Sequence, residues 1–318
     1  METKAMRDVF IEEIYHRMRG DKSIFFLCAD FGSPKLDRLR EDFKDRFINV
    51  GIAEQNLINV AAGLALEGFT VYACAIAPFL AMRPYEQIRV NLSLSAQLKE
   101  INVNLIGVGA GLSYDVSGPT HHCLEDLAIM NVLPNLEVFS PSDWVLAREF
   151  VDHSLKVKKP KYIRFDGKPL PQIYCSHKDI NFDKGFCELK KGGKICLVST
   201  GIMTHKALQA IDTLGNGGSD IGVIDVFMIK PLNETLLAKA LGRYRAVITL
   251  EEGFIDNGGL DSRILKIVNR MPSRIKFRNM GFSAKYVFDT GSRDYLHKLN
   301  KLDNASIIKN IKALLKRS

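Results

Sequence analysis

The sequence lacks the features that mark a membrane-bound, secreted or zinc-binding protein. It has no apolar run near the ~18–20 residues that a membrane span requires. Its first residues are charged and helix-like, without the apolar stretch of a signal peptide. Its six cysteines include no C-x-x-C pair, so buried reduced thiols are the better interpretation than disulfides or zinc sites. We therefore expect a cytoplasmic protein with no membrane partner and no metal site of its own.

Nucleic-acid-binding motifs are also missing, although the formal net charge is +8. Basic residues alternate with acidic ones along most of the chain, and no zinc-finger, RNP-type or P-loop motif occurs. The charge indicates a solvated basic surface, or a means of attracting phosphorylated substrates or an acidic partner. No nucleic-acid partner is expected.

What the sequence does contain is a regular alternation of strand-like and helix-like segments. This rhythm is typical of an α/β fold in which helices cover both faces of a mostly parallel sheet. Apolar runs predict strands at residues 24–28, 47–50, 70–74, 103–108, 136–139 and 162–165. Helical periodicity predicts helices near residues 53–67, 79–93, 122–131 and 142–155.

A break in the pattern separates two domains. Residues 166–193 hold two prolines and four glycines without a clear period. A second rhythm follows, with strands at 195–201, 221–229 and 246–252 and helices near 203–214, 233–241, 258–270 and 304–316. The prediction is two consecutive open, mostly parallel sheets with helices on both faces, in domains 1–175 and 194–318 joined by a linker at 176–193.

A single carboxylate stands out in the stretch FINVGIAEQNLINVAAGLALEG, residues 47–68. Glu54 lies in the first turn of a helix, where the helix dipole alone favours an acid. Its neighbours are mostly Ala, Gly, Leu and Val, however, and an acid in apolar surroundings can hold and share a proton. Both interpretations are open from the residues alone.

Two further segments contain residues that could act in a site. In GLSYDVSGPTHHCLEDLAIM, residues 111–130, His121 and His122 are adjacent, which suits neither a shared metal ion nor a common direction. One could pack while the other faces a cleft. In CAIAPFLAMRPYEQIRV, residues 74–90, Phe79 is explained by core packing unless its context indicates otherwise.

Taken together, these segments resemble a known family. The runs NVGIAEQN…AAGLALEG, FLAMRPYEQIR and GPTHHCLEDLAIM…LPNLEVFSPSD are similar in order and spacing to the pyrimidine-binding domain of the transketolase family of thiamine diphosphate enzymes, from about residue 5 to 165. VSTGIM, IDVFMIKPL and EEGFIDNGGL resemble the C-terminal domain of that family. The beta subunits of 2-oxo-acid dehydrogenases share the domain plan but match these motifs less well.

The resemblance also reveals an absence. Family enzymes bind the diphosphate and a divalent metal through Gly-Asp-Gly and a following Asn on a separate domain, and this sequence has no such motif. The resemblance implies a split enzyme. A partner subunit would hold the diphosphate and Mg²⁺ or Ca²⁺, this chain would be inactive alone, and the assembly would be an α2β2 heterotetramer.

The resemblance assigns roles on the cofactor side. It implies that Glu54 hydrogen-bonds the pyrimidine ring of thiamine diphosphate and that Phe79 stacks on that ring, with Leu80 as the alternative position. Asp30 matches an acid near the cofactor and the subunit junction. His121 matches a histidine that contacts the oxygen atoms of the substrate.

On the substrate side the match is partial. Arg7 and Arg164 lie where the family tends to place phosphate-binding groups, and Lys168 is a rival to Arg164. Ser117 replaces an acid that reads a hydroxyl of the acceptor sugar, and Gly109 stands where many members carry a substrate-contacting histidine. These departures suggest an unusual acceptor.

The predicted function is therefore that of a transketolase-like subunit in carbohydrate metabolism, which transfers a two-carbon ketol unit from a ketose donor to an aldehyde acceptor. One alternative is a carboligase that uses pyruvate, like deoxyxylulose-phosphate synthase. Another is a non-catalytic assembly or regulatory paralogue, which would not need an acid at position 54.

Overall fold

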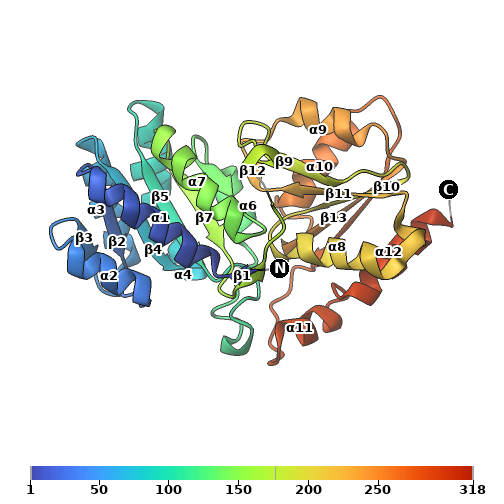
Figure 1. Cartoon of the computed structure of the whole chain (residues 1–318), viewed down its shortest axis with the longest axis horizontal. Helices are drawn as coiled ribbons and strands as arrows, with labels where there is room; N and C mark the ends of the chain where they lie inside the picture. Colours follow the sequence, from blue (N-terminus) through green and yellow to red (C-terminus); the bar gives the residue numbers. More distant parts are fainter. Residues whose placement is uncertain (1, 176, 317–318) are drawn as a thin grey trace.

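Two α/β domains lie side by side in the computed structural model, which describes residues 2–175 and 177–316 (Figure 1). The first is built on a seven-stranded sheet with the order β12-β6-β7-β5-β4-β2-β3. All neighbouring strands in it are parallel except the pair β12–β6, which is antiparallel. These parallel strands are β2 (Ile24–Cys28), β3 (Phe47–Asn49), β4 (Thr70–Ile76), β5 (Val103–Val108), β6 (Glu137–Phe139) and β7 (Lys161–Phe165).

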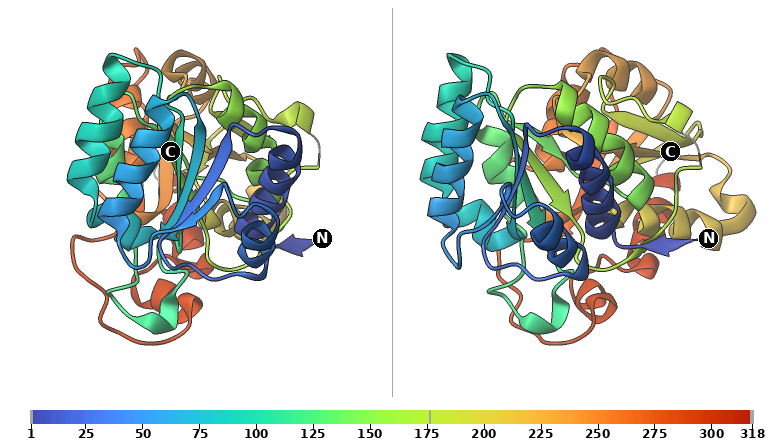
Figure 2. Two further views of the ribbon diagram at one scale, coloured as in Figure 1. Left: turned by 90° about the vertical axis from the view of Figure 1, so that its left-hand side faces the viewer. Right: turned by 60° about the vertical axis from the view of Figure 1, so that its left-hand side comes forward.

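Helices cover both faces of this sheet (Figure 2). One face packs against α1 (Met6–Gly20), α2 (Pro34–Asp42) and α7 (Trp144–Lys156). The other packs against α3 (Glu54–Leu66), α4 (Ala77–Met82), α5 (Tyr85–Gln87), the π-helix Ile88–Leu94 and α6 (Asp126–Val132). Burial on both faces explains why β5 reads as an uninterrupted run of buried residues and not as an alternating pattern.

The second domain holds a five-stranded sheet with the order β14-β13-β10-β11-β9. Only β9 runs antiparallel to its neighbour, and it lies within the segment predicted as a linker. The strands are β9 (Phe186–Lys190), β10 (Ile195–Ser199), β11 (Ile221–Val226), β13 (Ala246–Phe254) and β14 (Lys276–Phe282). The helices are α8 (Ile202–Leu214), α9 (Glu234–Leu241), α10 (Leu260–Asn269), α11 (Arg293–Leu299) and α12 (Asn304–Leu315). The predicted fold class is confirmed.

Several details differ from the sequence prediction. Residues 221–229 form two strands, because β12 (Met228–Lys230) leaves the second sheet and pairs antiparallel with β6 of the first. The helix expected near 122–131 begins only at Asp126, after a loop. β14 and α11 were not expected, because their polar, half-exposed segments carry little apolar periodicity.

Short elements complete the chain. β1 (Thr3–Lys4) pairs antiparallel with β8 (Leu170–Pro171) and so ties the N-terminal segment to the end of the first domain. The single-turn 3₁₀ helices are Ser95–Gln97, Asp115–Ser117, His177–Asp179 and Gly215–Gly218. No helix in the described part of the chain combines the length and apolarity needed to cross a membrane.

Parallel pairing brings distant segments to one edge of the first sheet. The carboxyl ends of parallel strands face the same way, and open α/β sheets bind ligands at this edge. Asp30 follows β2, Glu54 follows β3, Phe79 follows β4, Gly109 follows β5 and Lys168 follows β7. These five residues therefore follow the carboxyl ends of their strands at one edge of the sheet, although the sequence spreads them over more than half of the first domain.

Candidate active site

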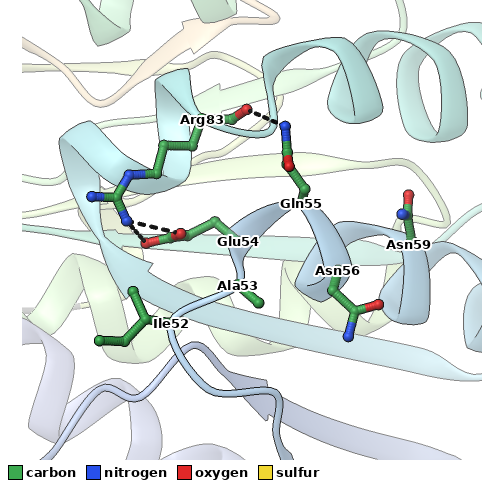
Figure 3. A pocket seen from close by; sticks show the side chains of 7 residues that line it. All are labelled: Ile52, Ala53, Glu54, Gln55, Asn56, Asn59 and Arg83. Carbon is green, nitrogen blue, oxygen red and sulfur yellow. Dashed lines mark hydrogen bonds and ion pairs between the residues drawn. The ribbon is translucent and has the colours of Figure 1, made fainter.

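Glu54 is buried at the start of α3, with 5% of its surface exposed. The chain leaves β3 and turns at Gly51, whose φ of 73° favours glycine. The N-cap residue, Ala53, makes no side-chain capping bond. The carboxylate borders a pocket of about 580 Å³, shown in Figure 3. The lining residues are Ile52, Ala53, Glu54, Gln55, Asn56, Asn59 and Arg83.

An arginine that the sequence analysis gave no role contacts this carboxylate. Arg83 Nη1 donates to both oxygens of Glu54, at 2.8 Å to Oε1 and 3.0 Å to Oε2 (Figure 3). Glu54 is therefore a buried acid whose surroundings include a cation as well as the apolar residues beside it in the sequence. Arg83 lies in the FLAMRPYEQIR segment, but no spacing rule links it to an acid 29 residues earlier.

The same arginine lies over the predicted stacking residue. Its Cζ atom is 4.2 Å from the centroid of the Phe79 ring. Phe79 is half-buried, whereas the neighbouring Leu80 is fully buried in the core. The planar guanidinium thus donates hydrogen bonds to Glu54 and covers the ring of Phe79 at the same time.

His121 lies beside these groups, and His122 does not. The His121 ring packs edge-on against Phe79 at 5.2 Å between centroids, and its Nδ1 is 3.1 Å from Thr120 Oγ1. His122 is buried, its Nε2 is 3.4 Å from the carbonyl oxygen of Asp115, and burial lowers its pKa. The two adjacent histidines therefore face different surroundings, and only His121 joins Phe79.

Tyr114 is a second residue that the sequence analysis passed over. Its ring packs edge-on near His121, at 6.4 Å between centroids. A Cβ atom on Gly109 would lie 2.2 Å from this ring, and one on Gly167 would lie 3.3 Å from it. The ring therefore fills a slot left by two glycines at the carboxyl ends of β5 and β7. Burial raises the pKa of its hydroxyl.

Residues of the second domain form hydrogen bonds with the loop that carries Tyr114. Glu252 Oε2 accepts from the backbone N–H of Leu112 at 3.0 Å, and Asp115 Oδ2 accepts from the backbone N–H of Arg293 at 2.7 Å. Arg293 Nε donates to Glu252 Oε1 at 2.8 Å. These residues were missed because the loop and its partners lie 140 and 178 positions apart in the sequence.

Asp115 also binds Lys168, the predicted rival for phosphate binding. Burial opposes the charged form of Asp115, but the bonds from Lys168 and from the backbone of Arg293 outweigh it and lower the pKa of the carboxyl. Ser117, two residues further on, is exposed to solvent. The loop residue predicted to contact the acceptor is therefore accessible, and Lys168 of the neighbouring ion pair is also about half exposed, whereas Asp115 is buried.

The structure does not place Arg164 as predicted. Its side chain is 3% exposed, and Nε donates to Asp126 Oδ2 at 2.7 Å. Nη2 donates to the carbonyl oxygens of Cys123 and Glu252. Nε and Nη2 thus have buried partners, and through them Arg164 joins the two domains instead of facing the cluster.

The remaining two predicted residues, Arg7 and Asp30, make their described contacts with other residues. Arg7 Nε donates to Asp8 Oδ1 at 2.7 Å, and its guanidinium lies 5.5 Å from the ring of Phe31. Asp30 is exposed and has a φ of 50°, and its backbone N–H donates to Asn49 Oδ1 at 3.0 Å. Neither makes its described bonds to Glu54 or His121, so their predicted roles stay predictions.

The described residues include no group of three or more His, Cys, Asp or Glu side chains that could hold a metal ion. What the cluster can hold is a flat ring that carries a hydrogen-bond donor. The guanidinium of Arg83 shows that one flat group can make both contacts, because it donates to the buried carboxylate and covers the aromatic face at the same time.

Comparison with known proteins agrees with this geometry. The family model for the transketolase pyrimidine-binding domain matches residues 2–171, and the model for the transketolase C-terminal domain matches residues 187–307. One of the apulose-4-phosphate transketolase subunits of Actinobacillus succinogenes is 32% identical over 95% of this chain and 96% of its own. The 1-deoxy-D-xylulose-5-phosphate synthase of Clostridium kluyveri is 30% identical over 99% of this chain and 49% of its own.

Solved structures give the same result. A split-gene transketolase, solved as an inactive β4 tetramer, superposes with a TM-score of 0.86 at 31% identity, over 98% of both chains. The predicted resemblance is confirmed: the chain belongs to the transketolase family, with the pyrimidine-binding and C-terminal domains of that family.

Proposed function

We propose that this chain is the pyrimidine-side subunit of a thiamine diphosphate-dependent transketolase that moves a two-carbon ketol unit from a ketose to an aldehyde. The observation that carries the proposal is the arrangement of Glu54, Phe79 and Arg83. A buried carboxylate and an aromatic face meet at one point, where a planar donor group already contacts both.

The residues present fit the pyrimidine end of the cofactor. Glu54 would accept a hydrogen bond from the ring and Phe79 would contact its face, once Arg83, which is half-exposed, moves aside. Thiamine diphosphate, when bound, supplies the reactive carbon that cleaves a ketose beside its carbonyl. Burial of Glu54 keeps water from competing for the hydrogen bond to the ring.

The other residues of the cluster would handle the substrate. His121 contacts Phe79 and has one ring nitrogen beside Thr120, so its other nitrogen would bind the oxygen atoms of a sugar. Ser117 can donate and accept a hydrogen bond without adding charge. Asp30, at the neighbouring strand end, would contact the cofactor or the partner subunit.

A second subunit would complete the site, since the sequence has no Gly-Asp-Gly motif for the diphosphate and its Mg²⁺ or Ca²⁺. The related split-gene transketolase chain, which was inactive as a β4 tetramer, supports this view. We infer an α2β2 heterotetramer in which this chain provides the pyrimidine side.

The proposal is tested by co-expression with a diphosphate-binding partner and by the variant Glu54→Gln. The amide keeps the shape but removes the acid, so turnover should fall by about 10²–10⁴-fold, as expected for lost acid–base function. Glu67→Gln, at the exposed far end of the same helix, is the matched control and should keep wild-type turnover. Light scattering checks that both variants assemble, and near-normal turnover of assembled Glu54→Gln would reject the role.

The choice of donor separates the proposal from the synthase-like alternative, which the 30% identity to 1-deoxy-D-xylulose-5-phosphate synthase supports. Hydroxypyruvate and pyruvate are compared at equal concentration in the assembled complex. Product from hydroxypyruvate alone supports ketol transfer, whereas a preference for pyruvate would indicate the carboligase.

A further inference from the structure

Arg83 makes, within this chain, the two contacts that the proposed function assigns to the pyrimidine ring of the cofactor. Its Nη1 donates to Oε1 and Oε2 of Glu54, at 2.8 Å and 3.0 Å (Figure 3). Its Cζ lies 4.2 Å from the centroid of the Phe79 ring. A carboxylate and an aromatic face that hold a flat guanidinium cannot hold a second flat group in the same place. Binding of the ring and the contact with Arg83 therefore exclude each other.

The two partners of this ion pair differ in burial. The side chain of Glu54 is 5% exposed, whereas that of Arg83 is 47% exposed. In the described part of the chain, Glu54 has no other ion pair, and Arg83 is its only side-chain hydrogen-bond donor. A buried carboxylate without a donor is costly, so the pair should persist in the free chain. A displaced Arg83 regains water on its exposed side, so the pair can also open when a competing group arrives.

The side chain of Arg83 can move while its backbone stays in place. Arg83 is the C-cap residue of α4, and its backbone N–H donates to the carbonyl oxygen of Phe79 at 3.1 Å. Its own carbonyl oxygen accepts from Gln55 Nε2 of α3 at 3.4 Å. These bonds fix the backbone between the two helices, and the guanidinium borders the pocket of about 580 Å³. Rotation of the side chain alone therefore uncovers Glu54 and Phe79.

We propose that Arg83 is an internal competitor for the pyrimidine site, which closes the site in the free chain and leaves it when an aminopyrimidine binds. This inference rests on the proposed function and names a means of regulating the same site. A ligand displaces Arg83 only if it offers both a flat face for Phe79 and a hydrogen-bonding edge for Glu54. The apparent affinity of the free chain is lowered, because only the fraction of molecules with an open site can bind. Contacts between the diphosphate and the partner subunit would supply the binding energy that displaces Arg83 in the assembled enzyme.

The first test measures binding of thiamine to the free chain by ligand-observed NMR titration, a method suited to weak binding. Arg83→Ala should bind thiamine about tenfold more tightly than wild type, since a charged hydrogen bond of typical strength no longer competes for Glu54. Arg89→Ala is the matched control and should bind as wild type does, because Arg89 is exposed on the π-helix Ile88–Leu94 and lines a different pocket. Equal or weaker binding by Arg83→Ala would overturn the proposal.

The two halves of thiamine test which contact is in competition. The aminopyrimidine half, hydroxymethylpyrimidine, should show the same gain in affinity for Arg83→Ala as thiamine does. The thiazole half, hydroxyethylthiazole, should show no gain, because it has no amino-substituted edge to replace the guanidinium at Glu54. A gain for both halves would indicate a general loosening of the pocket and would reject the competitor role.

Arg83→Lys keeps a cation beside Glu54 and so guards against a loss of folding in Arg83→Ala. An ammonium group lacks the flat fork of a guanidinium, so the gain in affinity should be smaller than for Arg83→Ala but measurable over wild type. Thermal unfolding of each variant shows that the titrations compare folded proteins. If Arg83→Ala does not fold, an affinity of Arg83→Lys no higher than that of wild type counts against the competitor role and overturns it.

Glu54→Gln separates this inference from the proposed function. Added to Arg83→Ala, it should remove most of the gained affinity for the aminopyrimidine half, because the amide lacks the acid that pairs with the ring. If Glu54→Gln weakens binding but Arg83→Ala does not strengthen it, the competitor role fails and the proposed function stands. Unchanged binding after Glu54→Gln in the Arg83→Ala background would instead reject the proposed role of Glu54.

Discussion

Arg293→Met should destabilise the chain, because it removes the cation from a buried ion-pair network. The guanidinium lies at the junction of the two domains, where it bonds Glu252 through two nitrogens and Asp166 through a third. Methionine has similar length and no charge, so it leaves both carboxylates buried without their main partner. Breaking a buried ion pair from one side costs about 3–5 kcal/mol. Glu252 keeps its bond to His297, so we take the lower figure, about 3 kcal/mol.

The expected effect has a measurable size and a pH dependence. At about 2–4 °C per kcal/mol for a domain of this size, the melting temperature should fall by about 6 °C or more. Burial alone would raise the pKa of Glu252, but the charge and hydrogen bonds of Arg293 hold it well below its usual value. That contribution to wild-type stability is present above the unfolded-state pKa of about 4.3 and is lost as pH falls through the folded value.

In the variant, Glu252 can instead take up a proton, so the stability gap should shrink as the solution becomes acidic. The assay is thermal unfolding at about pH 7 and about pH 5, a range that approaches the unfolded-state pKa of a glutamate. Lys194→Met, which removes a half-exposed ion pair, serves as control and should cost less than about 1 kcal/mol. A loss below about 1 kcal/mol for Arg293→Met near pH 7, or a gap independent of pH, would refute the reasoning.

Two further predictions concern packing and protonation. Gly109→Ala should destabilise the chain by about 2 kcal/mol or more, because its positive φ is strained for alanine and the new Cβ overlaps Tyr114. Urea denaturation measures this cost, which should be smaller in a Tyr114→Ala background. An equal cost in both backgrounds would contradict the predicted overlap with Tyr114. Burial raises the pKa of Asp225 to about 6, so the folded chain retains a proton there that the unfolded chain releases from about pH 4. Through this group, the free energy of unfolding should decline by about 1 kcal/mol between about pH 5 and pH 7. Asp225→Asn should remove that part of the pH dependence of stability. An unchanged pH dependence in Asp225→Asn would exclude Asp225 as its source.

Local sequence pattern was enough to predict the fold class and the outline of the site. Strands such as 24–28 and 103–108 were predicted at their observed bounds, because continuous apolar runs bounded by turn residues leave few alternatives. Motif order identified Glu54, Phe79 and His121, which the structure brings to one edge of the sheet. Parallel pairing makes this convergence a consequence of topology.

Which charged side chains form buried ion pairs depends instead on how the elements pack. Arg164 was expected to bind phosphate, but folding buries it against Asp126. Arg83 had no assigned role, yet it covers the two groups on which the proposed function depends. Ion pairs form between residues far apart in the chain and depend on distances of a few ångströms, so neither composition nor periodicity specifies them. The local pattern therefore places a side chain on an element, and the packing of elements determines what that side chain can bind.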